Sequence, residues 1–483
     1  MSADPVALLK KHLGYPGFRP GQEELVRAVL AGRDALGILP TGGGKSVCYQ
    51  IPALALGGLT LVITPLVSLM EDQVRRAREA GLRAAFMGSA QEPGERRTIT
   101  EAARTGALDV LFVAPERIGL APFLRLVAEC DVRLLAVDEA HCISQWGHDF
   151  RPSYREIGRL RALVRCPVLA LTATATPSVR EDVRTNLGMV DPEIVVQSFD
   201  RPWRVERVGA RENRMRRLHR VLRRHPGTVI VYAATRGGVE EVRNALARLG
   251  HRTEAYHAGL SGETRTRVLH GFMANDCRIV VATNAFGMGI DKPDVRLVVH
   301  VQLPTTLEAY YQEAGRAGRD GEPATCLAFY HPGDRQVGQM SHPGLDLLRR
   351  VHRTLLRAAD AFRVVDTTAS ELAGSLGCKL SQEDIPPVLD ALERTGAIRR
   401  LPAKASIADG THASDRGSHH IRVGVHSRVD LAWANEPRQS AARKIVAVER
   451  YARGRGCRRA ELLRYFGEAS QRRCHACDRC SPR

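Results

Sequence analysis

The sequence predicts an α/β protein: two parallel-sheet domains in tandem, then a winged-helix-like domain and a small helical module that binds metal. Three observations carry this prediction. Short apolar runs alternate with amphipathic stretches through two long regions, the pattern pauses once between them, and a cluster of Cys residues lies at the end of the chain. A length of 483 residues also suits several domains better than one.

The first region runs from about Asp34 to Gln197, and its apolar runs have the length of buried strands. The runs are DALGILP, LTLVITP, DVLFVAP, LLAVDEA and CPVLALTA. Strands buried on both faces give near-continuous apolar runs, because helices cover both sides of a parallel sheet. We therefore expect a first α/β domain over residues 1–198.

The alternating pattern pauses between Asp191 and His225, in a stretch rich in Arg, and then starts again. The second set of runs is TVIVYAA, RTEAYHA, CRIVVAT, VRLVVHV and TCLAFY. A second α/β domain over residues 199–342 fits this restart better than one very large sheet.

Beyond Tyr330 the pattern changes. Leu345 to Phe362 predicts an amphipathic helix, followed by two short helices about a Gly-marked turn and a hairpin through Arg400 to Val425. This order predicts a winged-helix-like domain over residues 343–435, with the polar segment SIADGTHASDRGSHH as a loop or wing tip. Residues 436–483 are expected to form a basic helical module that ends in the Cys cluster.

The chain carries 71 Lys and Arg against 53 Asp and Glu, a formal net charge of +18. Such a charge favours a polyanionic partner, nucleic acid before a membrane surface, because neutralised phosphates release counterions. Most of the basic residues are Arg, which suits bidentate phosphate contacts. A GC-rich genome would explain the excess of Arg over Lys equally well.

The sequence predicts neither a secretory leader nor a membrane span. Its first residues contain no continuous apolar segment, and the longest apolar stretch, Ile51 to Met70, is interrupted by Pro and Gly. We therefore expect a cytoplasmic protein.

The segment LPTGGGKS, from Leu39 to Ser46, follows an apolar run and precedes a helical stretch, which is the context of a P-loop. Backbone N–H groups would surround the phosphates, Lys45 would reach the β- and γ-phosphates, and Ser46 would hold Mg²⁺. The residues predicted to bind nucleotide here are Thr41, Gly42, Gly43, Gly44, Lys45 and Ser46. Leu39 replaces the first Gly of the generic pattern, and a Gly-rich turn without ligand is the alternative.

Asp138 and Glu139 end the apolar run LLAV, so both carboxylates are expected at the carboxyl edge of the sheet, where ligands of such folds bind. Asp138 could hold Mg²⁺ together with Ser46, and Glu139 could orient and deprotonate the attacking water. The alternative is an acidic cap at the end of a strand.

In the second domain, YYQEAGRAGRDG places Gln312, Arg316 and Arg319 four and three residues apart, on one face if the segment is helical. Two guanidiniums there could neutralise the charge that develops on a transferred phosphoryl group. A solvated Arg face is the alternative.

The last Cys residues follow the pattern C-x16-C-x2-C-x2-C, formed by Cys457, Cys474, Cys477 and Cys480. Thiolates at this spacing in an intracellular protein predict a tetrahedral Zn²⁺ site with a structural role. His475 lies inside a tight knuckle and is the poorer ligand. Four free thiols are the alternative.

Several stretches occur in the order found in a known family. They are LGYPGFRPGQEE, LPTGGGKS, TPLVSLMEDQ, VAPER, DEAHCISQWGHDFRPSY, LTATAT, YHAGL, VVATNAFGMGIDKP and QEAGRAGRDG, and CRRAELLRYFGE belongs to the zinc module. On these residues the chain resembles the RecQ family of superfamily 2 DNA helicases, over essentially its whole length. The resemblance implies that both α/β domains are RecA-like.

The resemblance also implies roles for individual residues. Tyr15, Arg19 and Gln22 match the motif that holds adenine, Gln22 through the base edge and the other two by stacking. An exposed helix-start residue is the alternative for Gln22. Arg319 is the first choice for the arginine finger, with Arg316 beside it across the cleft.

The stretch CISQWGHDFRPSY is similar to the aromatic-rich loop of the family. Bases could stack on its aromatic rings while Arg holds phosphate. The residues predicted to contact DNA are Trp146, His148, Phe150, Arg151 and Tyr154. An ordinary packed loop with buried aromatic side chains is the alternative.

The implied function is that of an ATP-dependent 3′ to 5′ DNA helicase that uses ATP, Mg²⁺ and Zn²⁺ and unwinds duplex or branched DNA in recombination, repair or replication. Single-stranded DNA, single-stranded-DNA-binding proteins and other repair proteins are the implied partners, for a monomer in the cytoplasm or at the nucleoid. One departure concerns the winged helix, which commonly follows the zinc module in this family but precedes it here. The roles of the usual winged helix are therefore not carried over.

Two other function classes stay open on the sequence. An RNA-remodelling enzyme of the DEAD-box type is disfavoured by DEAH, TATAT and the aromatic-rich loop. A DNA-binding scaffold without activity is disfavoured because every catalytic position is filled.

Overall fold

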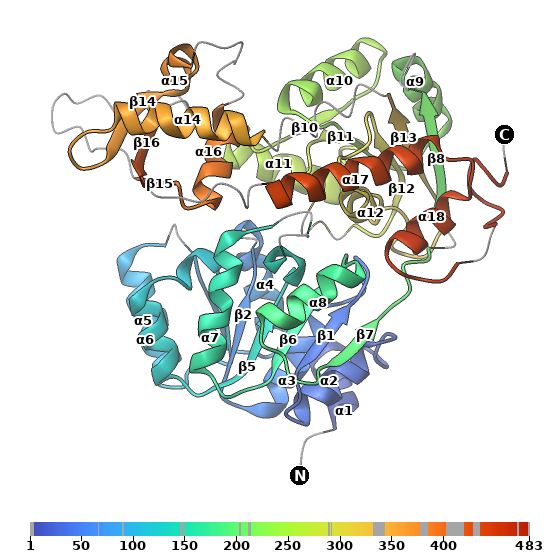
Figure 1. Ribbon diagram of the computed structural model, residues 1–483. Coiled ribbons are helices and arrows are strands. Elements are labelled where there is room, and N and C mark those ends of the chain that lie inside the picture. The colour runs from blue at the N-terminus through green and yellow to red at the C-terminus, as the bar shows by residue number, and fades with distance from the viewer. Residues whose placement is uncertain are drawn as a thin grey trace. The chain divides into compact units, whose positions relative to one another are not determined.

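The computed structural model divides the chain into two compact units, residues 1–331 with 451–483 and residues 332–450. It describes residues 4–65, 67–88, 91–144, 147, 150–201, 204–210, 214–287, 290, 292–331, 343–376, 385–401, 420–427, 435–470 and 473–481. The first unit contains both predicted α/β domains and the Cys cluster (Figure 1). The domain boundaries given above remain predictions.

The first α/β domain is built on a seven-stranded, all-parallel sheet in the order β3-β4-β2-β5-β6-β1-β7. The strands are β1 (Ala35–Ile38), β2 (Leu59–Ile63), β3 (Ala84–Met87), β4 (Val110–Val113), β5 (Val132–Val137), β6 (Val168–Thr172) and β7 (Glu193–Val196). All five apolar runs of the first region form strands, which confirms the parallel sheet.

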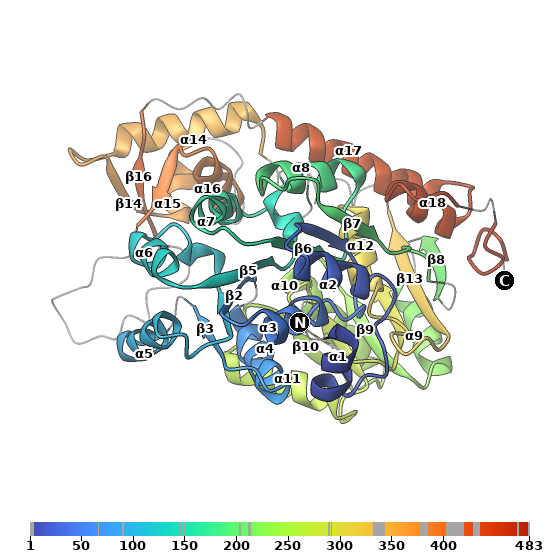
Figure 2. The same cartoon turned by 90° about the horizontal axis from the view of Figure 1, so that it is seen from below.

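Helices cover both faces of this sheet, as Figure 1 and Figure 2 show. One core cluster joins the sheet to α2 (Gln22–Leu30), α3 (Val47–Leu56) and α4 (Val67–Glu79). A second cluster joins the opposite face to α5 (Pro93–Arg104), α6 (Ala121–Glu129), α7 (Ile157–Leu163) and α8 (Pro177–Asn186). The remaining elements are α1 (Pro5–Leu13) and the short 3₁₀ turns η1 (Pro115–Arg117), η2 (Ala140–Ile143) and η3 (Pro152–Glu156).

The second α/β domain contains a six-stranded, all-parallel sheet in the order β10-β11-β9-β12-β13-β8. The strands are β8 (Arg204–Ala210), β9 (Thr228–Tyr232), β10 (Glu254–Tyr256), β11 (Ile279–Ala282), β12 (Val295–His300) and β13 (Ala324–Tyr330). The helices are α9 (Arg214–Arg224), α10 (Arg236–Arg248), α11 (Gly262–Met273) and α12 (Leu307–Ala314).

The pause in the sequence pattern contains two strands that were not predicted, β7 and β8. Each lies at the edge of its sheet, and β7 alternates half-buried and exposed side chains instead of forming an apolar run. The chain passes from the first sheet to the second through the short segment that follows Val196 and precedes Arg204.

The second unit contains the three helices and the hairpin that the sequence predicted, in that order, and one strand that was not predicted, β14. It contains α14 (Leu345–Ala358), β14 (Val364–Thr368), α15 (Ala369–Ser375), α16 (Ile385–Arg394), β15 (Ile398–Arg400) and β16 (His420–Val425). The strands form an antiparallel sheet in the order β14-β16-β15, so β15 and β16 are the predicted hairpin. The predicted wing tip lies outside the described residues.

Helix α17 (Asn435–Arg453) leads from the second unit back to the first, where α18 (Arg458–Tyr465) precedes the last Cys residues. In the described part of the chain, no helix combines the length and the apolarity that a membrane crossing would need.

Candidate active site and metal centre

The predicted P-loop connects β1 to α3, so it lies at the carboxyl edge of the first sheet. Gly42 and Gly44 have φ angles of +78° and +74°, a region that side chains with a Cβ seldom adopt. A Cβ on Gly43 would lie 2.8 Å from the carbonyl oxygen of Pro40. The turn therefore requires its glycines, and it has the strand-to-helix geometry of a phosphate-binding loop.

Lys45 on this loop forms an ion pair with Glu139, with 3.1 Å between Nζ and Oε1. Both side chains are largely buried, at 17% and 11% exposed. Burial disfavours the charge on Lys45, but Glu139 and Asp138 more than offset it, so the pKa of Lys45 is raised. The structure thus brings Lys45 and Glu139 into contact at the carboxyl edge of the first sheet.

Asp138 and Glu139 follow β5, and both are buried. Burial raises the pKa of Asp138 to about 6, with a further contribution from the neighbouring charge of Glu139. Burial also acts to raise the pKa of Glu139, but Lys45 and His141 hold it well below its usual range. Glu139 is therefore charged at neutral pH.

Glu139 has a φ angle of +46°, which is strained for a residue with a side chain. His141 lies under it, with Nδ1 3.3 Å from Oε2 of Glu139 and 2.9 Å from the hydroxyl of Thr172. Thr172 ends β6, in the stretch LTATAT. His141 and Thr172 were not predicted as site residues, although both lie in stretches that carried the family resemblance.

Two of the predicted adenine-binding residues, Arg19 and Gln22, contact the P-loop. The amide nitrogen of Gln22 donates to the carbonyl oxygens of Gly43 and Gly44 at 3.0 and 2.9 Å, and its oxygen accepts from the main-chain N–H of Arg19 at 2.9 Å. Tyr15 is half exposed. To bind the edge of a base, the Gln22 amide would therefore have to give up its hydrogen bonds to the carbonyl oxygens of Gly43 and Gly44.

Arg316 and Arg319 come from the second domain, but not from one helix face as the spacing suggested. Helix α12 ends at Ala314, and the segment after it is a series of turns. Arg316 is only 3% exposed, and its Nε and Nη1 atoms have no hydrogen-bond partner among the described residues. A buried guanidinium with unused donors is suited to an incoming anion.

Arg319 lies against the P-loop of the first domain. Its Cδ is 3.4 Å from the place that a Cβ on Gly42 would occupy, and its Nη1 donates to the carbonyl oxygen of Ile290 at 2.6 Å. The second domain therefore places the side chain of Arg319 against the P-loop of the first domain.

The four predicted zinc ligands converge. The Sγ atoms of Cys457, Cys474, Cys477 and Cys480 all lie within 4.8 Å of one another. Main-chain N–H groups point to two of the sulfurs: Cys477 to the Sγ of Cys474, and Arg458 to the Sγ of Cys477, both at 3.4 Å. Four thiols with amide donors fit a tetrahedral Zn²⁺ site, which confirms the predicted centre.

The predicted DNA-contacting loop is described in part, because Trp146 and His148 lie outside the described residues. Phe150 and Arg151 are half-buried, and Nη1 of Arg151 donates to the carbonyl oxygen of Pro65 at 3.1 Å. Tyr154 is 0% exposed, so its ring has no face for a base. The prediction of base stacking on Tyr154 is therefore corrected: its hydroxyl instead donates to the carbonyl oxygen of Asp138.

Family models match three parts of the chain: DEAD/DEAH box helicase over residues 19–183, helicase conserved C-terminal domain over residues 213–321, and RecQ zinc-binding over residues 423–481. The ATP-dependent DNA helicase RecQ of Pasteurella multocida is 45% identical over 66% of this chain and 51% of its own length. The probable ATP-dependent DNA helicase RecS of Bacillus subtilis is 37% identical over 74% of this chain and 72% of its own length.

Among solved structures, the helicase Lhr of Mycobacterium smegmatis, bound to single-stranded DNA and AMP-PNP, has a TM-score of 0.56 at 22% identity, over 91% of this chain and 63% of that one. This likeness supports the two RecA-like domains. The chain spans about half the length of the RecQ relatives that it matches. On the three matched models and its identity to RecQ and RecS, the chain belongs to the RecQ family of DNA helicases.

Proposed function

We propose that this protein is an ATP-dependent DNA helicase that translocates 3′ to 5′ on single-stranded DNA and opens duplex or branched DNA. The observation that carries the proposal is the convergence at one edge of the first sheet. Lys45 and Glu139 form an ion pair at this edge, and Arg319 of the second domain lies against the P-loop that carries Lys45. Family membership and the net charge of +18 support DNA as the partner.

In the proposed mechanism, Ser46 and Asp138 would hold Mg²⁺, and the ion would neutralise part of the phosphate charge of ATP. Lys45 exchanges its ion pair with Glu139 for the phosphates. Glu139 is then free to orient the attacking water and to accept its proton. Arg316 and Arg319 stabilise the charge that develops on the transferred phosphoryl group, which draws the two domains together.

The DNA-contacting residues are proposed to be Trp146, His148, Phe150 and Arg151, in the stretch of sequence that follows Asp138 and Glu139. Because hydrolysis is proposed to occur between the two domains, each cycle of closing and reopening moves the strand held across them. A cytoplasmic location and a monomeric state complete the proposal.

The experiment that tests the proposal is an ATPase assay of the full chain with single-stranded DNA, with RNA and without nucleic acid. We expect strong stimulation by DNA and loss of turnover in Lys45→Ala. Stimulation by RNA alone would favour an RNA-remodelling enzyme. A wild-type chain without nucleic-acid-stimulated turnover would favour a scaffold.

A further inference from the structure

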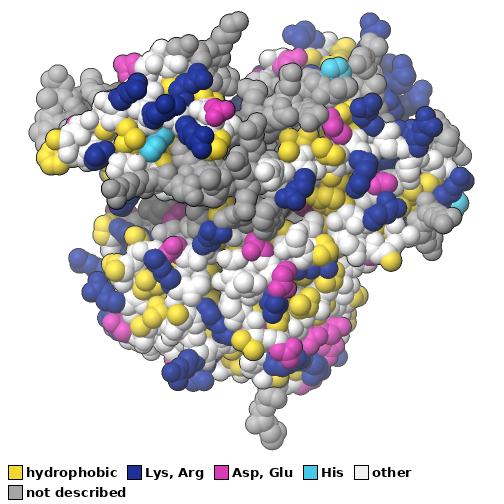
Figure 3. Space-filling model, viewed as in Figure 1, with side chains coloured by type: hydrophobic (Ala, Val, Ile, Leu, Met, Phe, Trp, Pro, Cys, Tyr) yellow, Lys and Arg dark blue, Asp and Glu magenta, His cyan; other side chains and the backbone are white. Residues whose placement is uncertain are grey.

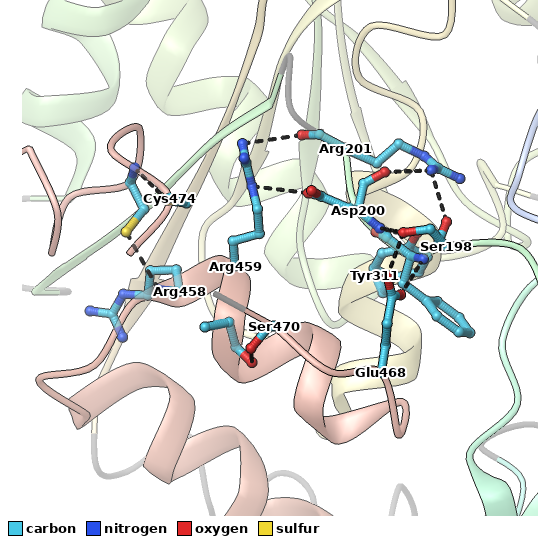
Figure 4. Close-up of polar contacts among 12 residues, drawn as sticks. Ser198, Asp200, Arg201, Tyr311, Arg458, Arg459, Glu468, Ser470 and Cys474 are labelled. Carbon is cyan, nitrogen blue, oxygen red and sulfur yellow. Dashed lines mark hydrogen bonds and ion pairs between the residues drawn. The ribbon is translucent and has the colours of Figure 1, made fainter. Parts of the chain in front are cut away.

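The zinc module contacts the segment that joins the two parallel sheets. Figure 4 shows Glu468, just after α18, next to this segment. The carboxylate of Glu468 accepts a hydrogen bond from the Ser198 hydroxyl at 2.6 Å and another from the Phe199 N–H at 2.8 Å. Both carboxylate oxygens of Glu468 therefore accept hydrogen bonds from the linker between the two domains.

Arg459, in the first turn of α18, holds the next part of the same segment. Its Nε lies 3.2 Å from a carboxylate oxygen of Asp200, and its Nη2 donates to the carbonyl oxygen of Arg201 at 3.4 Å. The side chain of Arg459 is only 16% exposed, so this ion pair is partly shielded from water. The two ends of the α18 region thus contact consecutive residues of the linker (Figure 4).

An aromatic cluster completes the contact. The ring of Phe199 stacks on Phe466 with 4.3 Å between centroids, and Tyr311 of α12 packs edge-on against both. The hydroxyl of Tyr311 donates to the carbonyl oxygen of Phe199 at 2.9 Å. On the other side, Arg180 of α8 donates to the carbonyl oxygen of Phe466 at 2.9 Å. The module therefore contacts both α/β domains as well as their linker.

The same helix carries one side of the metal centre. Cys457 immediately precedes α18, and the N–H of Arg458 points to the Sγ of Cys477. The guanidinium of Arg458 is buried and lies 3.0 Å from the carboxylate of Asp478. Arg458, which contacts the thiol cluster, is followed directly in the chain by Arg459, which pairs with Asp200. The metal centre and the contact with the linker are therefore adjacent on α18.

We propose that the zinc module is a clamp on the interdomain hinge, with Glu468 and Arg459 as positioning residues that fix Ser198 to Arg201. A free linker would allow many relative positions of the two domains, whereas a fixed one restricts closure to one path. The clamp makes each ATP-driven closure move DNA by a reproducible amount. This inference rests on the proposed function for its consequence, but not for its contacts.

The first test is hydrogen exchange on the full chain without ATP or DNA. The Phe199 N–H should be protected in the wild type and exchange at least about tenfold faster in Glu468→Ala, while zinc content stays at one per chain. Ser470→Ala is the matched control: its hydroxyl lies in the same module and donates to Ala460, away from the linker. The control should leave the Phe199 exchange rate unchanged.

The second test compares unwinding with hydrolysis. Glu468→Ala should keep DNA-stimulated ATP turnover within about twofold of the wild type but unwind at least about fivefold less DNA per ATP. Glu468→Gln, which keeps one acceptor for the Phe199 N–H, should restore part of this ratio. A loss of stability alone would lower both rates together and leave the ratio unchanged.

Either of two results would overturn the clamp: unchanged protection of Phe199 in Glu468→Ala, or unchanged DNA unwound per ATP. If Glu468→Ala loses zinc, Ser198→Ala is tested in its place, because it removes one contact with Glu468 from the linker side. It must then show faster exchange of the Phe199 N–H and less DNA unwound per ATP, both to a smaller extent. A wild-type chain without ATP turnover would refute the proposed function, and the exchange experiment would still decide on the clamp.

A separate observation concerns α9, whose solvent face is a stripe of arginines. Arg216, Arg217, Arg220, Arg223 and Arg224 are all exposed and recur at the spacing of one helix face. Leu218 and Leu222 on the opposite face are buried in the core of the second domain. In Figure 3, the surface over α9 carries several Lys and Arg side chains.

Among the described residues, this arginine stripe has no acidic counterpart. Within the described residues, none of its five guanidiniums forms an ion pair with a carboxylate, whereas Arg75 and Arg184 on helices of the first domain do. Nearby, the pKa of His251 is lowered by burial and by His219, Arg278 and Arg223. The region therefore has a net positive field, in which a bound anion would be stabilised.

We propose that the arginine stripe binds the phosphate backbone of a nucleic-acid duplex, as a contact separate from the predicted site between the domains. From Arg216 to Arg224 the helix rises about 12 Å, over which B-form DNA presents about seven phosphates. The stripe contains no exposed apolar side chain that could anchor a peptide, so a sequence-independent phosphate contact fits it best.

The test compares Arg217→Gln/Arg220→Gln/Arg224→Gln with a control of equal charge change, Arg75→Gln/Arg159→Gln/Arg184→Gln, whose arginines are exposed and ion-paired. The stripe variant should bind duplex DNA at least about tenfold more weakly at low salt, with a shallower salt dependence. The control should bind as the wild type does. Unchanged affinity of the stripe variant for duplex DNA would overturn the proposal.

Discussion

The hydroxyl of Tyr154 donates a hydrogen bond of 3.0 Å to the main-chain carbonyl oxygen of Asp138, and both residues are buried. Tyr154 is the last residue of the predicted DNA-contacting loop, and Asp138 directly follows the central strand β5. The far end of the loop is therefore fastened to the strand end that carries the predicted catalytic carboxylates. A change in the loop can reach Asp138 through a single hydrogen bond.

We expect Tyr154→Phe to weaken the response to DNA more than the basal activity. The substitution removes one buried hydrogen bond, so the free energy of unfolding should fall by about 1 kcal/mol. Basal ATP turnover should persist, while its stimulation by single-stranded DNA should fall severalfold. Urea unfolding and ATPase assays with and without DNA measure both effects. Full stimulation in a destabilised variant would assign Tyr154 a packing role only.

Replacement of Arg316 by Met should separate stability from activity. The buried guanidinium has unpartnered Nε and Nη1 atoms, and burial of unsatisfied donors costs free energy. Without nucleotide, the free energy of unfolding of Arg316→Met should therefore exceed that of the wild type by about 1 kcal/mol or more. The variant should also unfold at a higher temperature. ATP turnover should fall at least about a thousandfold. A less stable variant with normal turnover would contradict the role proposed for Arg316.

Binding of Mg²⁺ with nucleotide should depend on pH through Asp138. Because burial raises the pKa of this carboxyl to about 6, it becomes protonated as the pH falls through that value and no longer offers a charged ligand. The affinity for Mg²⁺ should therefore be full above about pH 7 and fall by about tenfold per pH unit below 6. Mg²⁺ titrations of fluorescent-nucleotide binding measure this, with Asp138→Asn as the variant that lacks the transition.

Loss of one zinc ligand should loosen the end of the chain. Cys474→Ser should lower the zinc content to well below one per chain and expose the region of α18 to protease, because such sites supply much of the folding energy of their module. Cys130→Ser is the control, since Cys130 is a half-buried free thiol outside the cluster. Zinc release and limited proteolysis report both effects. A protease-resistant module without zinc would contradict the structural role of the metal.

Much of the site could be predicted because it depends on residues that follow apolar runs. Glu139 follows a buried parallel strand, and Lys45 lies on a Gly-rich loop after another, so the apolar runs and the P-loop motif together placed both at one edge of a sheet. The zinc ligands were predicted for a different reason, because the spacing of Cys residues limits which thiols can meet around one ion. The strands β3, β7, β8 and β14 were missed. All four lie at the edge of a sheet, where a strand needs no continuous apolar run.

Side-chain environment was harder to predict than position. The aromatic ring of Tyr154 is as compatible with a core as with a stacking surface, and only its burial distinguishes the two. Arg316 follows a helical pattern that stops at Ala314, because Gly315 and Gly318 permit the turns that replace the helix. The contacts of Glu468 with Ser198 and Phe199 join residues some 270 positions apart, and no local pattern marks them.

The central claim is tested most directly with Glu139→Gln on a duplex that carries a 3′ overhang of single-stranded DNA. The substitution keeps the size of the side chain and removes the charge that accepts the proton. The wild type should unwind this duplex with ATP, and the variant should still bind ATP while hydrolysis and unwinding fall at least about a hundredfold. Unwinding by the variant at the wild-type rate, or no unwinding by the wild type, would contradict the proposed function.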